Sequence, residues 1–249
     1  MTELSNPAVG GRAEILDDGS ALAARAADFI AEKMRGCAAP FRLCLSGGST
    51  PRAAYRLLAG RNDLDWDCVE IFFGDERFVP PDHPDSNYRM ARETLLAAGN
   101  VRPRALLAMP TDGTPQSCAD AYEEILRQQY GASVLDPQAP LFDLMLLGLG
   151  ADGHTASLLP GQKVLEEKTR WVAPVPKGRD EVRLTLTYPA LESSRVTLFM
   201  VAGADKAEAV RRVRAGDTTL PAGALRPIGD VVWLLDRAAA GDKAFPMSR

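Results

Sequence analysis

A histidine follows one of the long apolar runs of the chain. Leu141–Leu149 leads into Gly150-Ala151-Asp152-Gly153-His154, which places Asp152 two positions before His154. Histidine titrates near neutral pH and can take a proton from water, and a nearby carboxylate can fix its tautomer and stabilise the imidazolium. The pair therefore predicts that His154 is a general base. The alternative is that Asp152-Gly153 only forms a turn and His154 only packs against it.

A glycine-rich segment follows an earlier apolar run. Phe41–Ser46 is followed by Gly47-Gly48-Ser49-Thr50-Pro51. We expect Thr50 to cap a helix that has Pro51 at its first position, so that free N–H groups and the positive helix end face the segment. The two glycines would let a ligand approach the backbone. These features predict a phosphate site, although a tight turn that needs glycine only for its backbone angles is the alternative.

The same segment lacks the lysine of a nucleoside triphosphate loop. Ser49 and Thr50 follow Gly48, where such a loop would carry Lys and then Ser or Thr. The sequence therefore favours a phosphate monoester over a nucleoside triphosphate.

A third run, Val69–Phe73, is followed by a charged segment that we predict to be a loop. Gly74-Asp75-Glu76-Arg77 could bind substrate, or it could be a solvated turn. Further on, Ser86 is a good N-cap for a helix that carries Tyr88, Ala91 and Leu95. We expect His83 to be an exposed loop residue and not a catalyst.

The elements that must position these segments alternate between strand and helix. Helical spacing places two sets of apolar residues each on one face of a predicted helix: Leu22, Ala26, Phe29, Ile30 and Met34 in the first helix, and Tyr122, Ile125 and Leu126 in the second. Alternation of this kind predicts a Rossmann-like α/β fold, in which helices cover both faces of a mostly parallel sheet. Ligands are expected beyond the carboxyl ends of the strands. Buried strands are expected at Phe41–Ser46, Val69–Phe73, Leu141–Leu149, Val196–Ala202 and Val231–Leu235.

Two further features concern the organisation of the chain. Arg183–Thr187 alternates in polarity and predicts a half-exposed strand, either at the sheet edge or reversed in direction. Pro80–Pro84 and Pro174–Pro176 are too short to be linkers and are expected to be structured loops. With no linker in sight, residues 1–249 are predicted to form a single domain.

Composition narrows the class of protein. The chain has 249 residues, a formal charge of −4 and two histidines. The acidic balance argues against a nucleic-acid partner, and the absence of a leader or a long apolar segment predicts a cytoplasmic protein without membrane contact. Cys37, Cys44, Cys68 and Cys118 have no ligand spacing and are expected in the core. We expect catalysis without a metal or other cofactor, and the oligomeric state is left open.

The three segments together resemble the 6-phosphogluconolactonase family in their order, spacing and residue types. They read Leu45-Ser-Gly-Gly-Ser-Thr-Pro51, Gly74-Asp-Glu-Arg-Phe-Val-Pro80 and Gly148-Leu-Gly-Ala-Asp-Gly-His-Thr-Ala-Ser-Leu-Leu-Pro-Gly161. The resemblance covers nearly the whole chain, because it continues through Asp85–Tyr88, Arg183–Thr187, Gly203–Lys206 and Val231–Asp236.

This resemblance implies roles for individual residues. It implies that His154 is the base with Asp152 nearby, that Arg77 contacts substrate or developing charge, and that Asp75 could orient Arg77. It also implies a phosphate site formed by Gly47, Gly48, Ser49, Thr50, Arg183 and Lys206. Without the resemblance, Arg183 could equally be a strand-face charge and Lys206 an exposed helix-start residue.

The implied reaction is hydrolysis of 6-phospho-D-glucono-1,5-lactone to 6-phospho-D-gluconate in the oxidative pentose phosphate pathway. The related glucosamine-6-phosphate deaminases share similar motifs, but they carry Glu five residues after the histidine, where this chain has Leu159, and their second motif reads Asp-Glu-Tyr, not Asp-Glu-Arg. A sugar-phosphate sensor is a second alternative, although no DNA-binding segment is evident.

Overall fold

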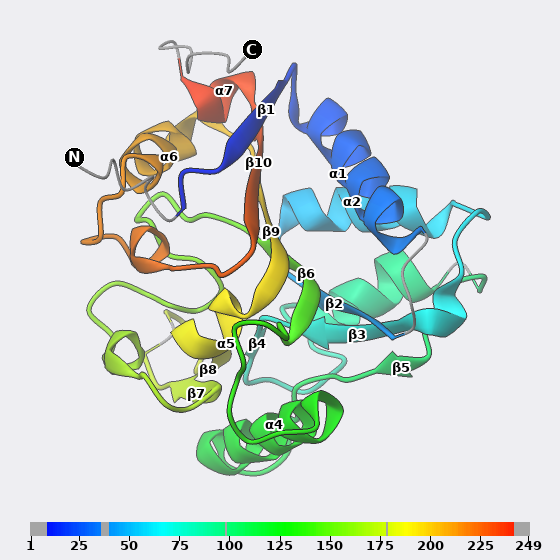
Figure 1. Ribbon diagram of the computed structural model, residues 1–249, viewed down its shortest axis with the longest axis vertical. Helices are drawn as coiled ribbons and strands as arrows, with labels where there is room; N and C mark the ends of the chain where they lie inside the picture. The colour runs from blue at the N-terminus through cyan, green and yellow to red at the C-terminus, as the bar shows by residue number, and fades with distance from the viewer. Residues whose placement is uncertain (1–8, 36–39, 98, 178, 242–249) are drawn as a thin grey trace.

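Seven strands form one sheet in the computed structural model, which describes residues 9–35, 40–97, 99–177 and 179–241 (Figure 1). Each neighbouring pair in this sheet is parallel, so the predicted α/β fold with a mostly parallel sheet is confirmed. In sheet order the strands are β1 (Arg12–Leu16), β10 (Asp230–Asp236), β9 (Ser194–Val201), β6 (Phe142–Leu147), β2 (Phe41–Leu45), β3 (Val69–Phe73) and β5 (Ala105–Leu106).

The strand order changes direction between β2 and β6. From β2 the sheet continues outward to β3 and β5, whereas from β6 it continues to β9 and β10 on the other side. The connections after two such strands leave in opposite directions and open a crevice at their carboxyl ends, which is where ligands bind in open α/β sheets. The glycine-rich segment follows β2 and the histidine segment follows β6. The fold thus brings both to the same crevice.

Helices cover both faces of the large sheet, as predicted. Figure 1 shows α1 (Gly19–Met34) and α2 (Ser49–Ala59) on one side, and α6 (Ala207–Arg214) and α7 (Arg237–Ala240) on the other. The remaining helices are α3 (Asn87–Ala91), α4 (Pro115–Tyr130) and α5 (Tyr188–Glu192), with single helical turns at Trp66–Cys68, Arg92–Leu96, Lys163–Glu166, Ala204–Lys206 and Pro221–Ala224.

A second, antiparallel sheet of three strands lies beside the crevice. Its order is β4 (Asp75–Arg77), β8 (Arg183–Leu186) and β7 (Val172–Val175), and α4 packs against β7 and β8. The loop predicted at Gly74–Arg77 is therefore wrong, because Asp75–Arg77 is a strand. Three residues are too few to show a strand period in the sequence.

The small sheet also differs in part from two other predictions made from the sequence. The strand predicted at Arg183–Thr187 is confirmed over Arg183–Leu186 and runs against its neighbours, but it is the buried centre of the small sheet and not a half-exposed edge. Pro174 lies inside β7, so Pro174–Pro176 is not wholly a loop. A proline is tolerated there because β7 is an edge strand, where a backbone donor can be spared.

Local sequence explains the two long helices. Asp18 caps α1 by accepting hydrogen bonds from the N–H groups of Ser20 and Ala21, at 2.8 and 2.9 Å. Thr114 and Ser117 form a capping box at the start of α4, and Gly131 ends that helix in the left-handed region. Both helices turn the apolar faces predicted from their spacing toward the core.

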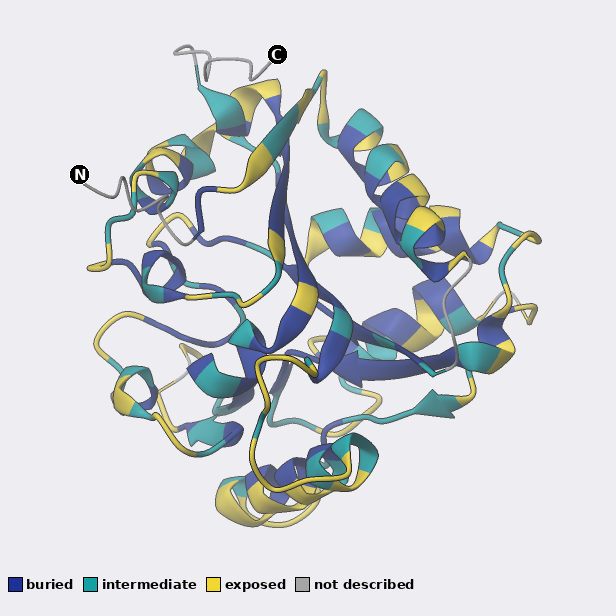
Figure 2. Cartoon of the chain, viewed as in Figure 1, coloured by how far each residue is buried: buried dark blue, intermediate teal, exposed yellow. Residues whose placement is uncertain are grey.

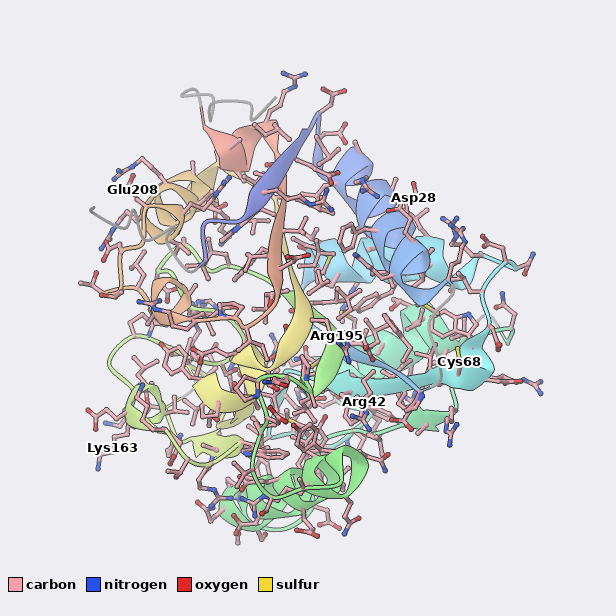
Figure 3. All side chains as sticks on the ribbon, in the orientation of Figure 1. Asp28, Arg42, Cys68, Lys163, Arg195 and Glu208 are labelled. Carbon is pink, nitrogen blue, oxygen red and sulfur yellow. The ribbon has the colours of Figure 1, made fainter. Side chains whose placement is uncertain are left out.

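Buried apolar side chains form a continuous core around the large sheet, visible as the dark strands and inner helix faces of Figure 2. Cys44 and Cys118 belong to this core, as predicted. Cys68 is only partly buried, near the start of β3 (Figure 3), because it lies in the helical turn at the sheet's rim. Cys37 lies outside the described residues.

Candidate active site

A cleft of about 250 Å³ opens at the carboxyl ends of β2 and β6. Of the ten residues predicted for the site, nine line this cleft; the tenth, Asp152, contacts its lining residue His154. The lining residues from that prediction are Gly47, Gly48, Ser49, Thr50, Asp75, Arg77, His154, Arg183 and Lys206. Side chains that are far apart in the sequence therefore share one space.

His154 and Asp152 form a close pair on one wall of the cleft. The Nδ1 atom of His154 lies 2.5 Å from Oδ1 of Asp152, and the backbone N–H of His154 donates to the same oxygen at 3.2 Å. Burial raises the pKa of Asp152, but the hydrogen bond and charge of His154, with the charge of Arg179, outweigh it and hold that pKa below its ordinary value. Asp152 is therefore an anion at neutral pH.

Gly150 makes room for this pair. A Cβ atom on Gly150 would lie 2.0 Å from Nδ1 of His154 and 2.6 Å from Oδ1 of Asp152. The backbone N–H of Gly150 donates to the carbonyl of His154 at 2.8 Å, and Gly153 turns the chain with φ of 79°. The histidine segment is thus the turn that the sequence offered as the alternative to a catalytic role. The same turn places the Asp152 carboxylate against the His154 ring.

The glycine-rich segment differs from its predicted capping. Helix α2 begins at Ser49 with Gly48 as its N-cap, so neither Thr50 as the cap nor Pro51 as the first helical residue is correct. The reason is Gly48 itself, whose φ of 113° turns the chain into the helix two residues earlier than the Thr-Pro pattern suggested. The N–H groups of the first turn still have no intrahelical acceptors and face the cleft.

The two glycines of that segment have different functions. A Cβ on Gly47 would lie 2.1 Å from Oδ1 of Asn87, so Gly47 accommodates the Asn87 side chain and does not simply open space for a ligand. Tyr55 of α2 fixes the preceding residue, because its hydroxyl accepts from the N–H of Ser46 and donates to its carbonyl. Asn87 and Tyr55 therefore both restrain the start of the glycine-rich segment.

Two arginines face each other at the edge of the small sheet. Arg77 of β4 and Arg183 of β8 are direct partners in the antiparallel register. Burial and the charge of Arg77 lower the pKa of Arg183, and the Nε atoms of both side chains are buried without a hydrogen-bond partner. Both side chains line the same cleft as the glycine-rich segment.

Asp75 does not pair with Arg77 as expected. Its carboxylate accepts from Oγ of Ser157 at 2.6 Å and from Nδ2 of Asn87 at 3.2 Å. Both donors are buried, so these two contacts orient Asp75 toward the cleft. The charge of Asp75 acts on Arg183, whose pKa it raises against the effect of burial.

Glu76 holds the segment after β4 in place. Its buried carboxylate accepts from the N–H groups of Arg77, Asn87 and Tyr88 at 2.7, 2.7 and 2.8 Å, and from Oγ of Ser86 at 3.1 Å. Ser86 in turn caps α3, as predicted. Burial raises the pKa of Glu76, although these backbone donors oppose the rise. Glu76 therefore supports the site from behind.

Lys206 reaches the cleft from the segment after β9. Its Nζ atom lies 2.8 Å from Oδ2 of Asp205. The backbone of this segment is tied to the end of β10, where the Asp236 carboxylate accepts from the N–H of Gly203 at 3.1 Å. Asp236 also caps α7 through the N–H of Ala239. Lys206 is thus carried by an anchored turn.

Other sequence expectations have plain outcomes. His83 lies in the loop before α3, as predicted, and its side chain is 42% exposed. Leu159 is buried in the core. The position five residues after His154 is therefore apolar and carries no acidic side chain. In the part of the chain that the structure describes, no cluster of three potential metal ligands occurs, and no helix is long and apolar enough to cross a bilayer.

Four residues of the site were not singled out from the sequence. Asn87 and Ser157 stand inside motifs that carried the resemblance, and their spacing from Ser86 and His154 was the available signal. Asp236 ends an apolar run, which hinted at a strand-end position. No sequence feature pointed to a role for Arg179, since an arginine among polar residues is usually exposed to solvent without a specific partner.

Comparison with known proteins supports the fold and the family. Residues 17–233 match the family described as glucosamine-6-phosphate isomerases/6-phosphogluconolactonase. A 6-phosphogluconolactonase from Nostoc sp. is 38% identical over 92% of this chain and 97% of its own length. One from Synechocystis sp. is 40% identical over 84% of this chain and 85% of its own length.

Solved structures agree. A 6-phosphogluconolactonase from Trypanosoma cruzi superposes with a TM-score of 0.82 at 26% identity, covering 95% of this chain and 98% of the other. A monomeric glucosamine-6-phosphate deaminase shares the fold, with a TM-score of 0.76 at 22% identity over 92% of this chain and 98% of the other. The family match spans most of the chain, and this protein is an enzyme of the glucosamine-6-phosphate isomerase/6-phosphogluconolactonase family.

Proposed function

We propose that this enzyme hydrolyses 6-phospho-D-glucono-1,5-lactone to 6-phospho-D-gluconate. The observation that carries the proposal is the presence of a histidine–aspartate pair and a cationic anion site in one cleft. A lactone that bears a phosphate needs both, a base for water at one end and compensation for a dianion at the other. The 6-phosphogluconolactonases among its relatives support the same substrate.

The phosphate end is formed by three parts of the chain. The first turn of α2 offers backbone N–H groups and the positive end of the helix. Arg183 and Lys206 add two cations from the small sheet and from the turn after β9. A phosphate dianion favours this mixture of backbone donors and charged side chains. The main-chain donors fix its position, and the cations supply most of the attraction.

The catalytic end relies on the tautomer of His154. A distance of 2.5 Å between Nδ1 and a carboxylate oxygen requires a proton between them, so Nδ1 carries it and Nε2 keeps its lone pair. Nε2 removes a proton from water as the water oxygen bonds to the lactone carbonyl carbon. Asp152 stabilises the resulting imidazolium.

The tetrahedral intermediate then collapses. Its carbon–oxygen bond to the ring oxygen breaks, and the proton held on Nε2 passes to that oxygen to give the open-chain acid. Arg77 is the cation placed to attract the negative charge that develops on the carbonyl oxygen. No cofactor is needed to balance this step, because water supplies both the nucleophile and the proton.

The amino-sugar phosphate deaminase reaction is the alternative within the family. The deaminase neighbour establishes a shared fold only, and fold alone does not decide the reaction. Leu159, an apolar core residue, stands where the resemblance would place the ring-opening glutamate of a deaminase. A lactone needs no such acid, since its ring opens at the carbonyl.

The test uses lactone freshly generated by oxidation of glucose 6-phosphate, with correction for spontaneous hydrolysis. Wild type should accelerate its loss, and His154→Ala should reduce kcat by about 10²- to 10⁴-fold. His83→Ala, which removes the exposed histidine, is the matched control and should retain full activity. No acceleration by wild type, or ammonia release from glucosamine 6-phosphate, would reject the lactonase proposal.

A further inference from the structure

Arg179 contacts the histidine–aspartate pair from outside the cleft. It lies between β7 and β8 of the small sheet, and its Nη2 atom is 3.1 Å from Oδ2 of Asp152 and 3.3 Å from Nδ1 of His154. Arg179 does not line the cleft where the phosphorylated lactone would bind. Its partners are therefore the catalytic side chains and not the reacting atoms.

The two contacts of Arg179 differ in kind. Because Nδ1 of His154 already carries the proton that it donates to Asp152, it cannot also accept a hydrogen bond from a guanidinium N–H. Arg179 therefore donates to Oδ2 of Asp152 and acts on His154 through charge alone. With Oδ1 bonded to His154 and Oδ2 to Arg179, both oxygens of the Asp152 carboxylate are occupied.

The backbone at Arg179 is unusual. Its φ is 110°, in the region that favours glycine, and Ala156 is the other non-glycine residue with positive φ in the described part of the chain. Arg179 also adds to the charges that lower the pKa of Arg183, after burial and Arg77. A strained, like-charged position is unfavourable for arginine unless its contact with Asp152 compensates.

We propose that Arg179 is a positioning residue, which fixes the Asp152 carboxylate and, through it, the orientation of the His154 ring. This inference rests on the proposed lactonase function. With Oδ2 of Asp152 held by Arg179, Oδ1 stays in place for Nδ1 of His154, so the ring keeps one orientation while it takes the proton from water and returns it to the departing ring oxygen.

Several charged groups act on His154 together. Asp152 and Arg179 touch the imidazole, and the cleft that it faces also contains Asp75, Arg77, Arg183 and Lys206. Replacing Arg179 changes only one of them. A change in the Arg179 variants therefore reports on this one contact.

Glycine is the informative replacement, because it suits the observed φ and removes the guanidinium. In Arg179→Gly, the melting temperature should equal or exceed that of wild type, and kcat should fall about three- to tenfold with little change in KM. Arg179→Lys keeps the charge but loses the planar fork, and should give an intermediate kcat. Arg195→Met is the matched control, since Arg195 of β9 also pairs with an aspartate, its Nε atom lying 3.0 Å from Oδ1 of Asp143 (Figure 3).

NMR of the imidazole groups tests the positioning without any substrate. The chain has two histidines, so His83 serves as an internal reference. In Arg179→Gly the imidazole signals of His154 should shift and broaden at neutral pH, because the Asp152 carboxylate that holds the ring has lost its second contact, while those of His83 stay unchanged. Changed His154 signals support the inference even if the lactone proves to be the wrong substrate.

Two results would overturn the inference. One is an Arg179→Gly protein with wild-type kcat and wild-type imidazole signals of His154, which would make the contact an ordinary surface ion pair. The other is a raised KM with unchanged kcat, which would make Arg179 a substrate-binding residue.

Discussion

Arg77 and Arg183 lie directly opposite each other in the antiparallel pair of β4 and β8, and the Nε atom of each is buried without a hydrogen-bond partner. Like charges in this arrangement repel each other in the empty protein. An anion between or beside them removes that penalty. The proposed phosphate site would therefore link the stability of the folded chain to the binding of an anion.

Arg183→Met should separate binding from stability. We expect KM for the phosphorylated lactone to rise about tenfold or more, because a charged hydrogen bond to phosphate is lost. The melting temperature of the ligand-free protein should not fall, since a buried cation that faces Arg77 has been removed. A lower melting temperature with unchanged KM would show that Arg183 is a structural charge.

The same reasoning predicts stabilisation by product. In thermal melts, 6-phosphogluconate should raise the melting temperature of wild type in a concentration-dependent way, because the ligand binds only the folded state. The rise should be much smaller in Arg183→Met and in Lys206→Met. Gluconate without phosphate is the control ligand and should have little effect on any of the three proteins.

Gly150→Ala should impair catalysis through steric displacement. The added Cβ would overlap Nδ1 of His154, so the imidazole must move from Asp152 and kcat should fall about a hundredfold. Gly60→Ala, at the end of α2 where the nearest atom would be 3.5 Å away, is the matched control. Comparable activities of the two variants would mean that the observed pairing is not required.

Asp236→Ala should weaken phosphate binding from a distance. Loss of its carboxylate frees the N–H of Gly203 and loosens the turn that carries Lys206, so KM should rise several-fold while kcat changes less. The cost in stability should be about 1 kcal/mol, because the cap of α7 is lost too. Lys206→Met provides the comparison, and a double variant should be little worse in KM than Lys206→Met alone.

Glu167 provides a pH-dependent contribution to stability. The backbone N–H groups of Arg170 and Thr169 hold its pKa at about 2, below the ordinary 4.5 of a glutamate. A carboxylate with a depressed pKa in the folded state stabilises above its unfolded pKa, and this stabilisation disappears as pH falls toward the folded value. Glu167→Gln should therefore be less stable than wild type at pH 7, by roughly 1 kcal/mol for so accessible a group, with a smaller difference at pH 3 in urea unfolding.

The large sheet could be predicted from the sequence because its strands are continuous apolar runs with turn residues at their ends. Val69–Phe73 matches its strand end for end. The small sheet could not be predicted as a sheet: β4 is three residues long, and β7 contains Pro174, so neither has a recognisable period. The strand β1 was missed because its five residues are half polar at the sheet edge.

The site could be predicted where the interacting residues lie within one short segment of the sequence. His154 and Asp152 are close in sequence, and their contact follows from a single turn. By contrast, the contact of Asp75 with Ser157 joins two sheets, and that of Arg179 with Asp152 depends on how the small sheet lies against the large one. Such distances are set by tertiary packing, which no local pattern encodes. That residues 1–249 form a single domain stays a prediction.

The pairing of the first and last strands has a consequence for synthesis on the ribosome. β1 is translated before its neighbour β10, because Arg12 lies opposite Val232, 220 residues further along the chain (232 − 12). At elongation rates of about 5–20 residues per second, β1 waits on the order of ten seconds or more for its partner. The Asp236 anchor for Lys206 emerges directly after this partner, so a nascent chain cannot complete the proposed phosphate site before β10 has been translated.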